Sequence, residues 1–130
     1  MKQLHPSGWP RPKGYSNGLA ARGRLVFTAG VVGWDQTETF VSDTLPGQFA
    51  QALSNVLAVL ACDGAGPGNI ARMTCYVISI DDYRASAKEI GAAWRQIIGP
   101  HYPAMALVEV RRLVEPEALV EIEATAVVPE

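Results

Sequence analysis

The sequence predicts an α+β domain in which a mixed β-sheet carries two helices packed on one face. Two stretches, 47–62 and 83–98, place apolar residues at three- and four-residue steps, the spacing of a helix with one buried side. Segments rich in β-branched and aromatic residues stand before, between and after them, in the order ββ-α-β-α-ββ. The length of 130 residues is that of one ordinary domain, so we expect a single domain over residues 1–130.

The N-terminal part is expected to form a loop followed by a β-hairpin. Residues 5–16 read HPSGWPRPKGYS, and the three prolines oppose both a helix and a continuous strand. Residues 24–32 read RLVFTAGVV, which has the composition of a strand. We expect this strand to pair with a shorter one at 15–21 across a turn at Arg22-Gly23.

The middle of the chain is expected to alternate helix, strand and helix. The first helix, 47–62, should end at Asp63-Gly64 because glycine favours helix termination. Residues 71–80 (ARMTCYVISI) then form a strand, and Asp81-Asp82 are placed to cap the second helix. The buried stripe of the first helix consists of Phe49, Ala52, Leu53, Val56, Leu57 and Leu60.

Two further strands, 104–113 and 119–128, complete the predicted sheet. In the last strand Glu121, Glu123 and Thr125 share one face, opposite the apolar residues Val120, Ile122, Ala124, Ala126 and Val128. Right-handed crossovers favour both helices on the same side of the sheet. The other side is then uncovered, and self-association is a natural way to bury it.

Composition excludes several classes of protein. Hydrophobic residues make up 48% of the chain and charged residues 18%, and no apolar run is long enough to span a bilayer, so no membrane partner is expected. A net charge of −2 offers no excess positive field for nucleic acid. Cys62 and Cys75 form no CxxC pair, which favours a reducing cytoplasm as the location. Two histidines, His5 and His101, far apart in the chain, make a metal site unexpected.

Four segments resemble successive blocks of one known family: GRLVFTAGVVGWD, QFAQALSNVLAVLACDGA, PAMALVEVRRL and ALVEIEATAVV. The resemblance extends over nearly the whole chain and is to the Rid (YjgF-type) family. Members of that family are called reactive-intermediate or enamine/imine deaminases, and some are called L-PSP endoribonucleases. The resemblance implies a chorismate-mutase-like fold, a homotrimer that binds a small-molecule ligand in clefts between subunits, and no metal or organic cofactor.

The resemblance also implies candidate ligand-binding residues, and one of them departs from the family pattern. Members that hydrolyse 2-imino acids carry an arginine two residues after the proline of a P-A-R block, where it pairs with the substrate carboxylate. Met105 occupies that position here. A thioether cannot make the two charge-assisted hydrogen bonds of an arginine. Tyr15, Gly30 and Glu121 match the cleft tyrosine, the glycine whose backbone approaches the ligand, and the cleft glutamate.

These residues leave more than one function open. The first hypothesis is an enamine/imine deaminase-type hydrolase for a small metabolite other than the usual 2-imino acid, with Glu121 as the catalytic acid or base. The second is a noncatalytic trimeric protein that binds a small molecule, with Glu121 in an intersubunit network. An endoribonuclease is the least favoured because the chain is acidic. Trp34 and Trp94 belong to the core or line a ligand pocket, and His101 lies in a surface loop or borders the cleft.

Overall fold

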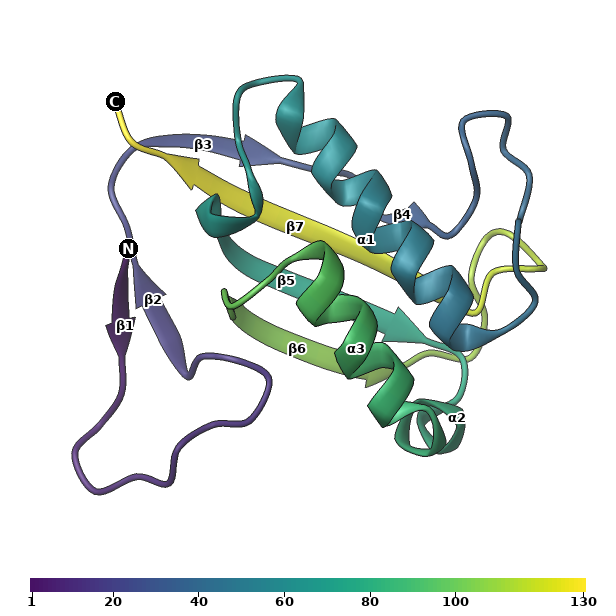
Figure 1. Cartoon of the computed structure of the whole chain (residues 1–130), viewed down its shortest axis with the longest axis horizontal. Coiled ribbons are helices and arrows are strands. Elements are labelled where there is room, and N and C mark those ends of the chain that lie inside the picture. Colours follow the sequence, from purple (N-terminus) through teal and green to yellow (C-terminus); the bar gives the residue numbers. More distant parts are fainter.

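The computed structural model describes residues 1–130 and has the predicted α+β architecture. The helices are α1 (Leu45–Ala61), α2 (Ile80–Ala85) and α3 (Ala87–Ile97), with a short 3-10 turn η1 (Pro67–Asn69). The strands are β1 (Lys2–Leu4), β2 (Gly18–Ala20), β3 (Arg24–Phe27), β4 (Val31–Val32), β5 (Ile70–Val77), β6 (Ala104–Glu109) and β7 (Val120–Val128). The main sheet has the order β3-β7-β5-β6, and β4 also pairs with β7. Helices α1 and α3 lie on the same side of this sheet (Figure 1).

Helix α1 begins and ends where side chains and turns satisfy its free backbone groups. The Thr44 side chain accepts a hydrogen bond from the Gly47 amide at 3.2 Å, and Pro46 lies in the first turn, where its missing amide costs nothing. Gly64 follows the helix with a φ of +76°, as expected for a terminating glycine. The helix starts two residues earlier than the apolar pattern predicts.

The second predicted helix, 83–98, is in fact two helices, so the chain has three in all. It begins at Ile80 because the Ser79 side chain, and not Asp81 or Asp82, caps it by accepting from the Asp82 amide at 3.0 Å. Ser86, with φ −102° and ψ 10°, interrupts the helical backbone between α2 and α3. The two aspartates lie in the first turn of α2, where their charges favour the amide end of a helix.

The predicted hairpin across Arg22-Gly23 is wrong. Strand β2 pairs antiparallel with β1 at the N-terminus, and β3 pairs antiparallel with β7 in the main sheet. The turn signal itself is real, because Gly23 has a φ of +151°. The chain uses it to pass from the small sheet to the large one, where the nine residues of β7 offer a longer partner than the three of β2.

The predicted strand 24–32 is interrupted by a β-bulge at residues 28–30. Positions 27 and 31 lie opposite 125 and 122 of β7, so four steps along one strand match three along the other. Thr28 holds the bulge in place: its amide donates to the Ala124 carbonyl at 2.9 Å, and its hydroxyl accepts from the Ala124 amide at 3.0 Å.

Strands β5 and β6 are parallel and are joined through α2 and α3, with Met73 opposite Met105. Both strands end earlier than the sequence predicts, at Val77 and Glu109. The chain leaves β5 because Ser79 starts a helix. It leaves β6 after the Val110 amide donates to the Val77 carbonyl at 2.8 Å.

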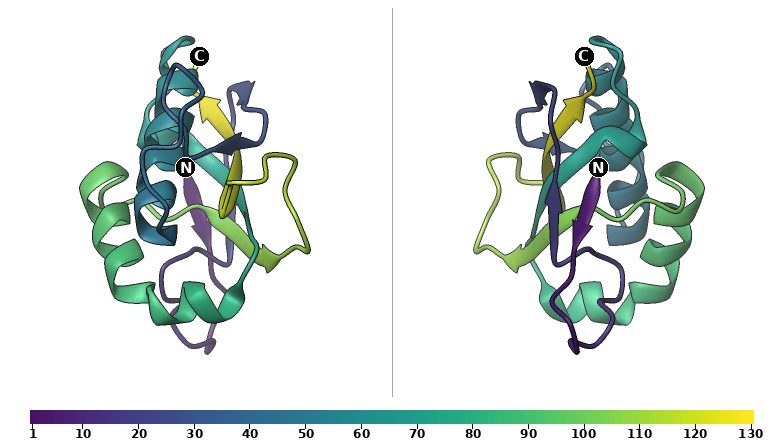
Figure 2. Two further views of the ribbon diagram at one scale, coloured as in Figure 1. Left: turned by 90° about the vertical axis from the view of Figure 1, so that its right-hand side faces the viewer. Right: turned by 90° about the vertical axis from the view of Figure 1, so that its left-hand side faces the viewer.

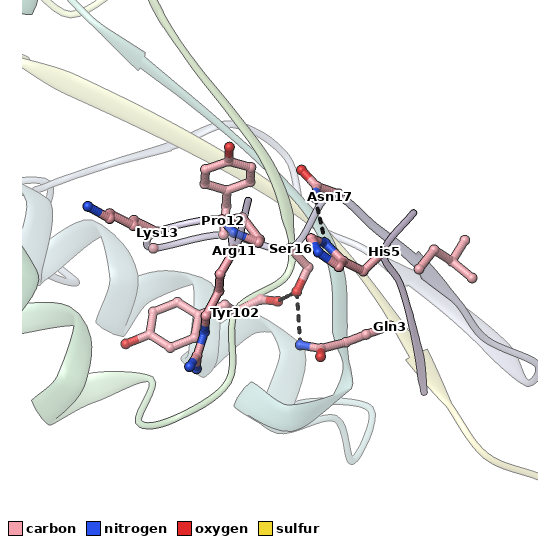
Figure 3. Close-up of a pocket in the computed structure, with 11 residues that line it drawn as sticks. Gln3, His5, Arg11, Pro12, Lys13, Ser16, Asn17 and Tyr102 are labelled. Carbon is pink, nitrogen blue, oxygen red and sulfur yellow. Dashed lines mark hydrogen bonds between the residues drawn. The ribbon is translucent and has the colours of Figure 1, made fainter. Parts of the chain in front are cut away.

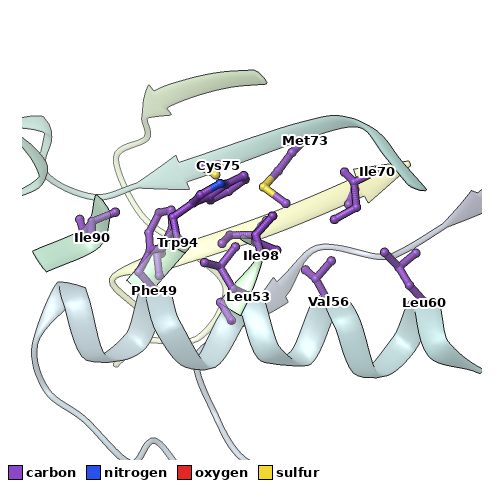
Figure 4. Packing of buried hydrophobic residues seen from close by; sticks show 14 of the residues in the cluster. Phe49, Leu53, Val56, Leu60, Ile70, Met73, Cys75, Ile90, Trp94 and Ile98 are labelled. Carbon is purple, nitrogen blue, oxygen red and sulfur yellow. The ribbon is translucent and has the colours of Figure 1, made fainter. Parts of the chain in front are cut away.

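The hydrophobic core lies between the helices and one face of the sheet. Phe49, Leu53 and Val56 of α1 meet Met73 and Cys75 of β5 there, and all five are buried (Figure 4). The edge-on views show both long helices on one side and none on the other (Figure 2). The uncovered face that the sequence predicts is therefore present, and it exposes 56% of Leu25, 65% of Phe27 and 42% of Val108.

Candidate functional site

Gly30 and Glu121 meet at the β3–β4 edge of the sheet. Val32 of β4 pairs with Glu121, and the bulge carries Gly30 against the glutamate side chain. A Cβ atom on Gly30 would lie 2.8 Å from Cδ of Glu121 and 3.1 Å from its Cγ. The absence of a side chain at Gly30 thus makes the space that the Glu121 carboxylate occupies.

Glu121 belongs to a group of three polar side chains on the uncovered face. Tyr76 pairs with Glu121 across β5 and β7, and its hydroxyl donates to Oε1 of Glu123 at 2.7 Å. That hydrogen bond, with some burial and the charges of both glutamates, raises the pKa of Tyr76. Glu123 is therefore engaged by a tyrosine, whereas no hydrogen bond holds the Glu121 carboxylate within the chain.

Met105 lies at the opposite edge, on the helix-facing side of β6. Its register partner Met73 is fully buried in the core, and Met105 is half-buried against that core. With α3 it lines a cavity of about 270 Å³, in which seven of the ten lining residues are hydrophobic. The one charged side chain that lines this Met105 cavity is Arg95.

Tyr15 stands near the start of the same edge strand, on the N-terminal arm formed by residues 1–20. The arm returns to the sheet at Ser16, whose amide donates to the Pro103 carbonyl at 3.0 Å and whose hydroxyl donates to the Tyr102 carbonyl. Tyr15 is 43% exposed and lines a second cavity, of about 520 Å³, between the arm and Tyr102 (Figure 3). We call this the arm cavity.

The structure keeps these two pairs of candidate residues apart within one chain. Glu121 and Met105 are two strands apart and face opposite sides of the sheet. On β5, which lies between their strands, the residue opposite Glu121 is Tyr76 and the residue opposite Met105 is Met73, three positions away. Strand spacing and rise then put their Cα atoms about 14 Å apart. A cleft lined by both pairs needs the β6 edge of one chain to meet the β3–β4 edge of another.

Three residues with open roles take structural positions. Nε2 of His101 donates to the Ile70 carbonyl at 2.6 Å, which ties the loop before β6 to β5. Trp94 is 6% exposed and belongs to the core, although one side of it lines the Met105 cavity. Trp34 packs against Phe40 in the loop after β4, with ring centroids 5.7 Å apart.

The apolar stripe predicted for the second helix supplies much of the helical side of the Met105 cavity, since Tyr83, Ala87, Ile90 and Trp94 all line it. Ala87, Gly91 and Arg95 line it, and they follow one another at four-residue steps. Gly91 and Arg95 lie outside that stripe, and their four-residue spacing from Ala87 is the sequence signal for them, since residues four apart share a helix face. No group of three or more His, Cys, Asp or Glu side chains has the arrangement of a metal site.

The fold, with one helical layer on a mixed sheet, defines an α+β protein of the YjgF type. The family described as endoribonuclease L-PSP matches residues 10–128. The chain belongs to this family, which includes the Rid proteins.

Several relatives cover most of the chain. The "RutC family protein slr0709" of Synechocystis is 35% identical over 99% of this chain and 98% of its own length. A "2-iminobutanoate/2-iminopropanoate deaminase" of Salmonella typhimurium is 31% identical over 81% of this chain and 80% of its own length. The crystal structure of the Rid family protein YyfB from Yersinia pestis, a protein of unknown function, superposes with a TM-score of 0.82 at 31% identity, covering 98% of both chains. No helix in the present structure is both long and apolar enough to cross a membrane.

Proposed function

We propose that this chain is an enamine/imine deaminase-type hydrolase that acts on a small metabolite other than a 2-imino acid. The family includes a relative named as a 2-iminobutanoate/2-iminopropanoate deaminase, which supports hydrolysis of a C=N bond as the chemistry. The protein works as a homotrimer with a cleft at each seam between subunits. Its two free cysteines, one of them exposed, suit the reducing cytoplasm as its location.

The observation that carries the proposed substrate class is the position of Met105. It lines an apolar cavity, and a thioether offers a carboxylate only dispersion and weak polar contact. Without the arginine fork, a 2-imino acid loses two charge-assisted hydrogen bonds, which is about a hundredfold in affinity. A substrate with an apolar group at this point loses no hydrogen bond, and it buries that group against Met105.

The reaction needs one group that moves protons, and Glu121 can supply it. Its carboxylate takes a proton from water as the water oxygen adds to the carbon of C=N, and it passes that proton to the imine nitrogen in the same step, so a neutral carbinolamine forms. Collapse of the carbinolamine then forms C=O, breaks the C–N bond and releases ammonia as the nitrogen takes up a second proton from the hydroxyl. Gly30 positions this carboxylate by leaving room for it at the bulge.

The trimer explains how the two pairs of candidate residues, which we call half-sites, come together to form one cleft. Gly30 and Glu121 lie on one edge of the sheet, and Tyr15 and Met105 lie near the other. Closing three chains edge to edge in a ring brings the first pair of each subunit to the second pair of its neighbour. The same closure buries the apolar side chains Leu25, Phe27 and Val108 on the uncovered face.

Ammonia release from a panel of enzymatically generated imines tests the proposed reaction. We expect turnover for imines with an apolar side chain, and about a hundredfold loss in Glu121→Gln, the size typical of a lost proton-transfer group. Gly30→Ala should displace the carboxylate and lose activity as well, whereas Gly68→Ala, where a Cβ meets nothing within 4 Å, should not. Rates no higher than buffer for every imine would refute the enzyme and leave the noncatalytic binding protein.

Met105→Arg tests the substrate class directly. Restoring the arginine should raise hydrolysis of 2-imino acids by at least about tenfold, because each charged hydrogen bond contributes more than 1 kcal/mol. Met105→Leu is the matched control, since it keeps an apolar side chain of similar size and should leave the preference unchanged. Equal rates on 2-imino acids in all three proteins would contradict the role assigned to Met105. A single-chain mass in light scattering would refute the trimer.

A further inference from the structure

The arm cavity contains positive charge without any acidic partner. Its lining includes Arg11 and Lys13, and no aspartate or glutamate lines it. The first 34 residues contain five lysines and arginines, and the first acidic residue of the chain is Asp35. The one ion pair in the chain joins Arg24 to Asp63, so neither Arg11 nor Lys13 is paired. Two unpaired cations in one concave site attract an anion.

Four other polar side chains of the cavity, those of Gln3, His5, Ser16 and Asn17, are engaged in holding the arm. Asn17 Nδ2 donates to Nδ1 of His5 at 3.0 Å, and Nε2 of His5 donates to the Trp9 carbonyl at 3.0 Å. Gln3 Nε2 donates to the Ser16 hydroxyl at 3.2 Å (Figure 3). These bonds fix the shape of the arm.

Arg11, Lys13 and the hydroxyls of Tyr15 and Tyr102 are the donors that stay free for a ligand. Arg11 is also restricted in conformation before any ligand arrives. It stands between Pro10 and Pro12, and the residue before a proline is confined to extended backbone conformations. Figure 3 shows its side chain directed toward the ring of Tyr102, while Lys13 extends the other way. A guanidinium on a restricted backbone loses less entropy when it pairs with an oxyanion than one on a flexible loop.

The arm cavity and the Met105 cavity are neighbours. Gly14 and Tyr102 line both of them, and the Tyr102 ring stacks on Trp94 with centroids 6.0 Å apart. One cavity is cationic and the other is apolar. A cavity of about 150 Å³ is enough to hold a benzene ring, so the 270 Å³ beside Met105 can take a ring or a branched chain.

We infer that the arm cavity binds the anionic group, a carboxylate or a phosphate, of a ligand whose apolar part lies in the Met105 cavity. The cation that recognises the ligand then comes from the N-terminal arm, at Arg11 and Lys13, and not from strand β6. The Met105 part of this inference rests on the proposed function, because it takes that cavity as part of the ligand cleft. The anion site itself rests on the charges and geometry of the arm.

Isothermal titration of the full-length protein with three probes tests the inference. The probes are 3-phenylpropanoate, phenyl phosphate and the neutral 3-phenylpropanamide. At least one anion should bind more tightly than the amide and lose affinity as ionic strength rises, and comparison of the two identifies the preferred oxyanion. Arg11→Gln and Lys13→Gln should each weaken that anion by about fivefold, the upper range for a partly exposed pair. Arg22→Gln is the control, since Arg22 is a cation of the same charge-rich segment that does not line the cavity.

The outcomes separate this inference from its rivals and from the proposed function. Equal affinities for the amide and both anions, or no effect of Arg11→Gln and Lys13→Gln, would overturn it. Loss of anion binding in Arg95→Gln alone would also overturn it and move the anion to α3. Anion binding that depends on Arg11, without hydrolysis of any imine, would refute the enzyme and keep the anion site. Imine hydrolysis without any preference for anions would support the enzyme and refute the anion site.

Discussion

Replacing Gln48 with methionine should destabilise the protein by about 2–3 kcal/mol, on three lost hydrogen bonds at about 1 kcal/mol each. Gln48 is 1% exposed on α1. Its Nε2 donates to the carbonyls of Ser42 and Glu117, both at 3.0 Å, and its Oε1 accepts from the Leu119 amide at 2.8 Å. Methionine has nearly the same volume, so the change removes the polar contacts and leaves the packing. It leaves three backbone groups of two loops without a partner.

Urea unfolding followed by tryptophan fluorescence measures this effect. With an m-value of about 2 kcal/mol/M, expected for a domain of this size, the midpoint should fall by about 1–1.5 M while m stays constant. Gln51→Met is the matched control on the same helix, because the Gln51 amide bonds only to Asn55 one turn away, at 2.9 Å. Its effect should stay within about 0.5 kcal/mol. Equal midpoint shifts in the two variants would refute the reasoning, since the burial of Gln48 and its hydrogen bonds to the two loops would then add nothing to the free energy of unfolding.

Three further predictions concern single side chains. Burial raises the pKa of Cys75 to about 12, so at mildly alkaline pH a thiol reagent such as Ellman's should modify only the exposed Cys62 in the folded protein; fast modification of both thiols would contradict this. The hydrogen bond to Glu123 raises the pKa of Tyr76, so the folded state holds this proton more tightly and its contribution to stability is present below about pH 10 and is lost above it. Tyr76→Phe should therefore flatten the fall in the urea midpoint at alkaline pH and should remove one late-titrating tyrosine from the ultraviolet absorbance titration; an unchanged titration would contradict it. Thr44→Ala should cost about 1 kcal/mol through loss of the cap on α1, seen as a lower thermal midpoint, and an unchanged midpoint would show that the cap contributes nothing.

The sequence predicts the layers of the fold because burial leaves a periodic signal. The stripe from Phe49 to Leu60 identifies α1, and the alternation from Val120 to Ala126 places Glu121 on the opposite face of β7, where the structure has it. Side-chain periodicity is local, so it survives in the sequence without knowledge of the partner.

The pairing of strands and the interruptions within them leave no periodic signal in the sequence. The residues of β2 suit either β1 or β3 as a partner, and the partner that β3 takes, β7, lies about a hundred residues further along the chain. The extra residue of the bulge changes the register without changing the composition of RLVFTAGVV, so the contact between Gly30 and Glu121 follows from three-dimensional pairing alone.

The cavities are even less visible in the sequence because they lie where elements fail to fill space. Gly14 and Tyr102, which separate the arm cavity from the Met105 cavity, are 88 positions apart in the chain. The charge of Arg11 and Lys13 is balanced in the overall composition, and only the arrangement of the arm shows that no carboxylate stands near them.

If the chain forms the trimer proposed above, the positions of Glu121 and Tyr15 near opposite sheet edges determine how mutations in different copies combine. In a ring closed edge to edge, each cleft between subunits takes Glu121 from one subunit and Tyr15 from its neighbour. A subunit altered at Glu121 therefore inactivates one of the two clefts that it borders, and a subunit altered at Tyr15 inactivates the other. When the two variants are co-expressed, a cleft that takes Tyr15 from the Glu121 variant and Glu121 from the Tyr15 variant contains both residues. Two variants that are inactive alone would therefore complement each other. A single altered copy mixed with normal ones would likewise disable only the seam to which it contributes that edge.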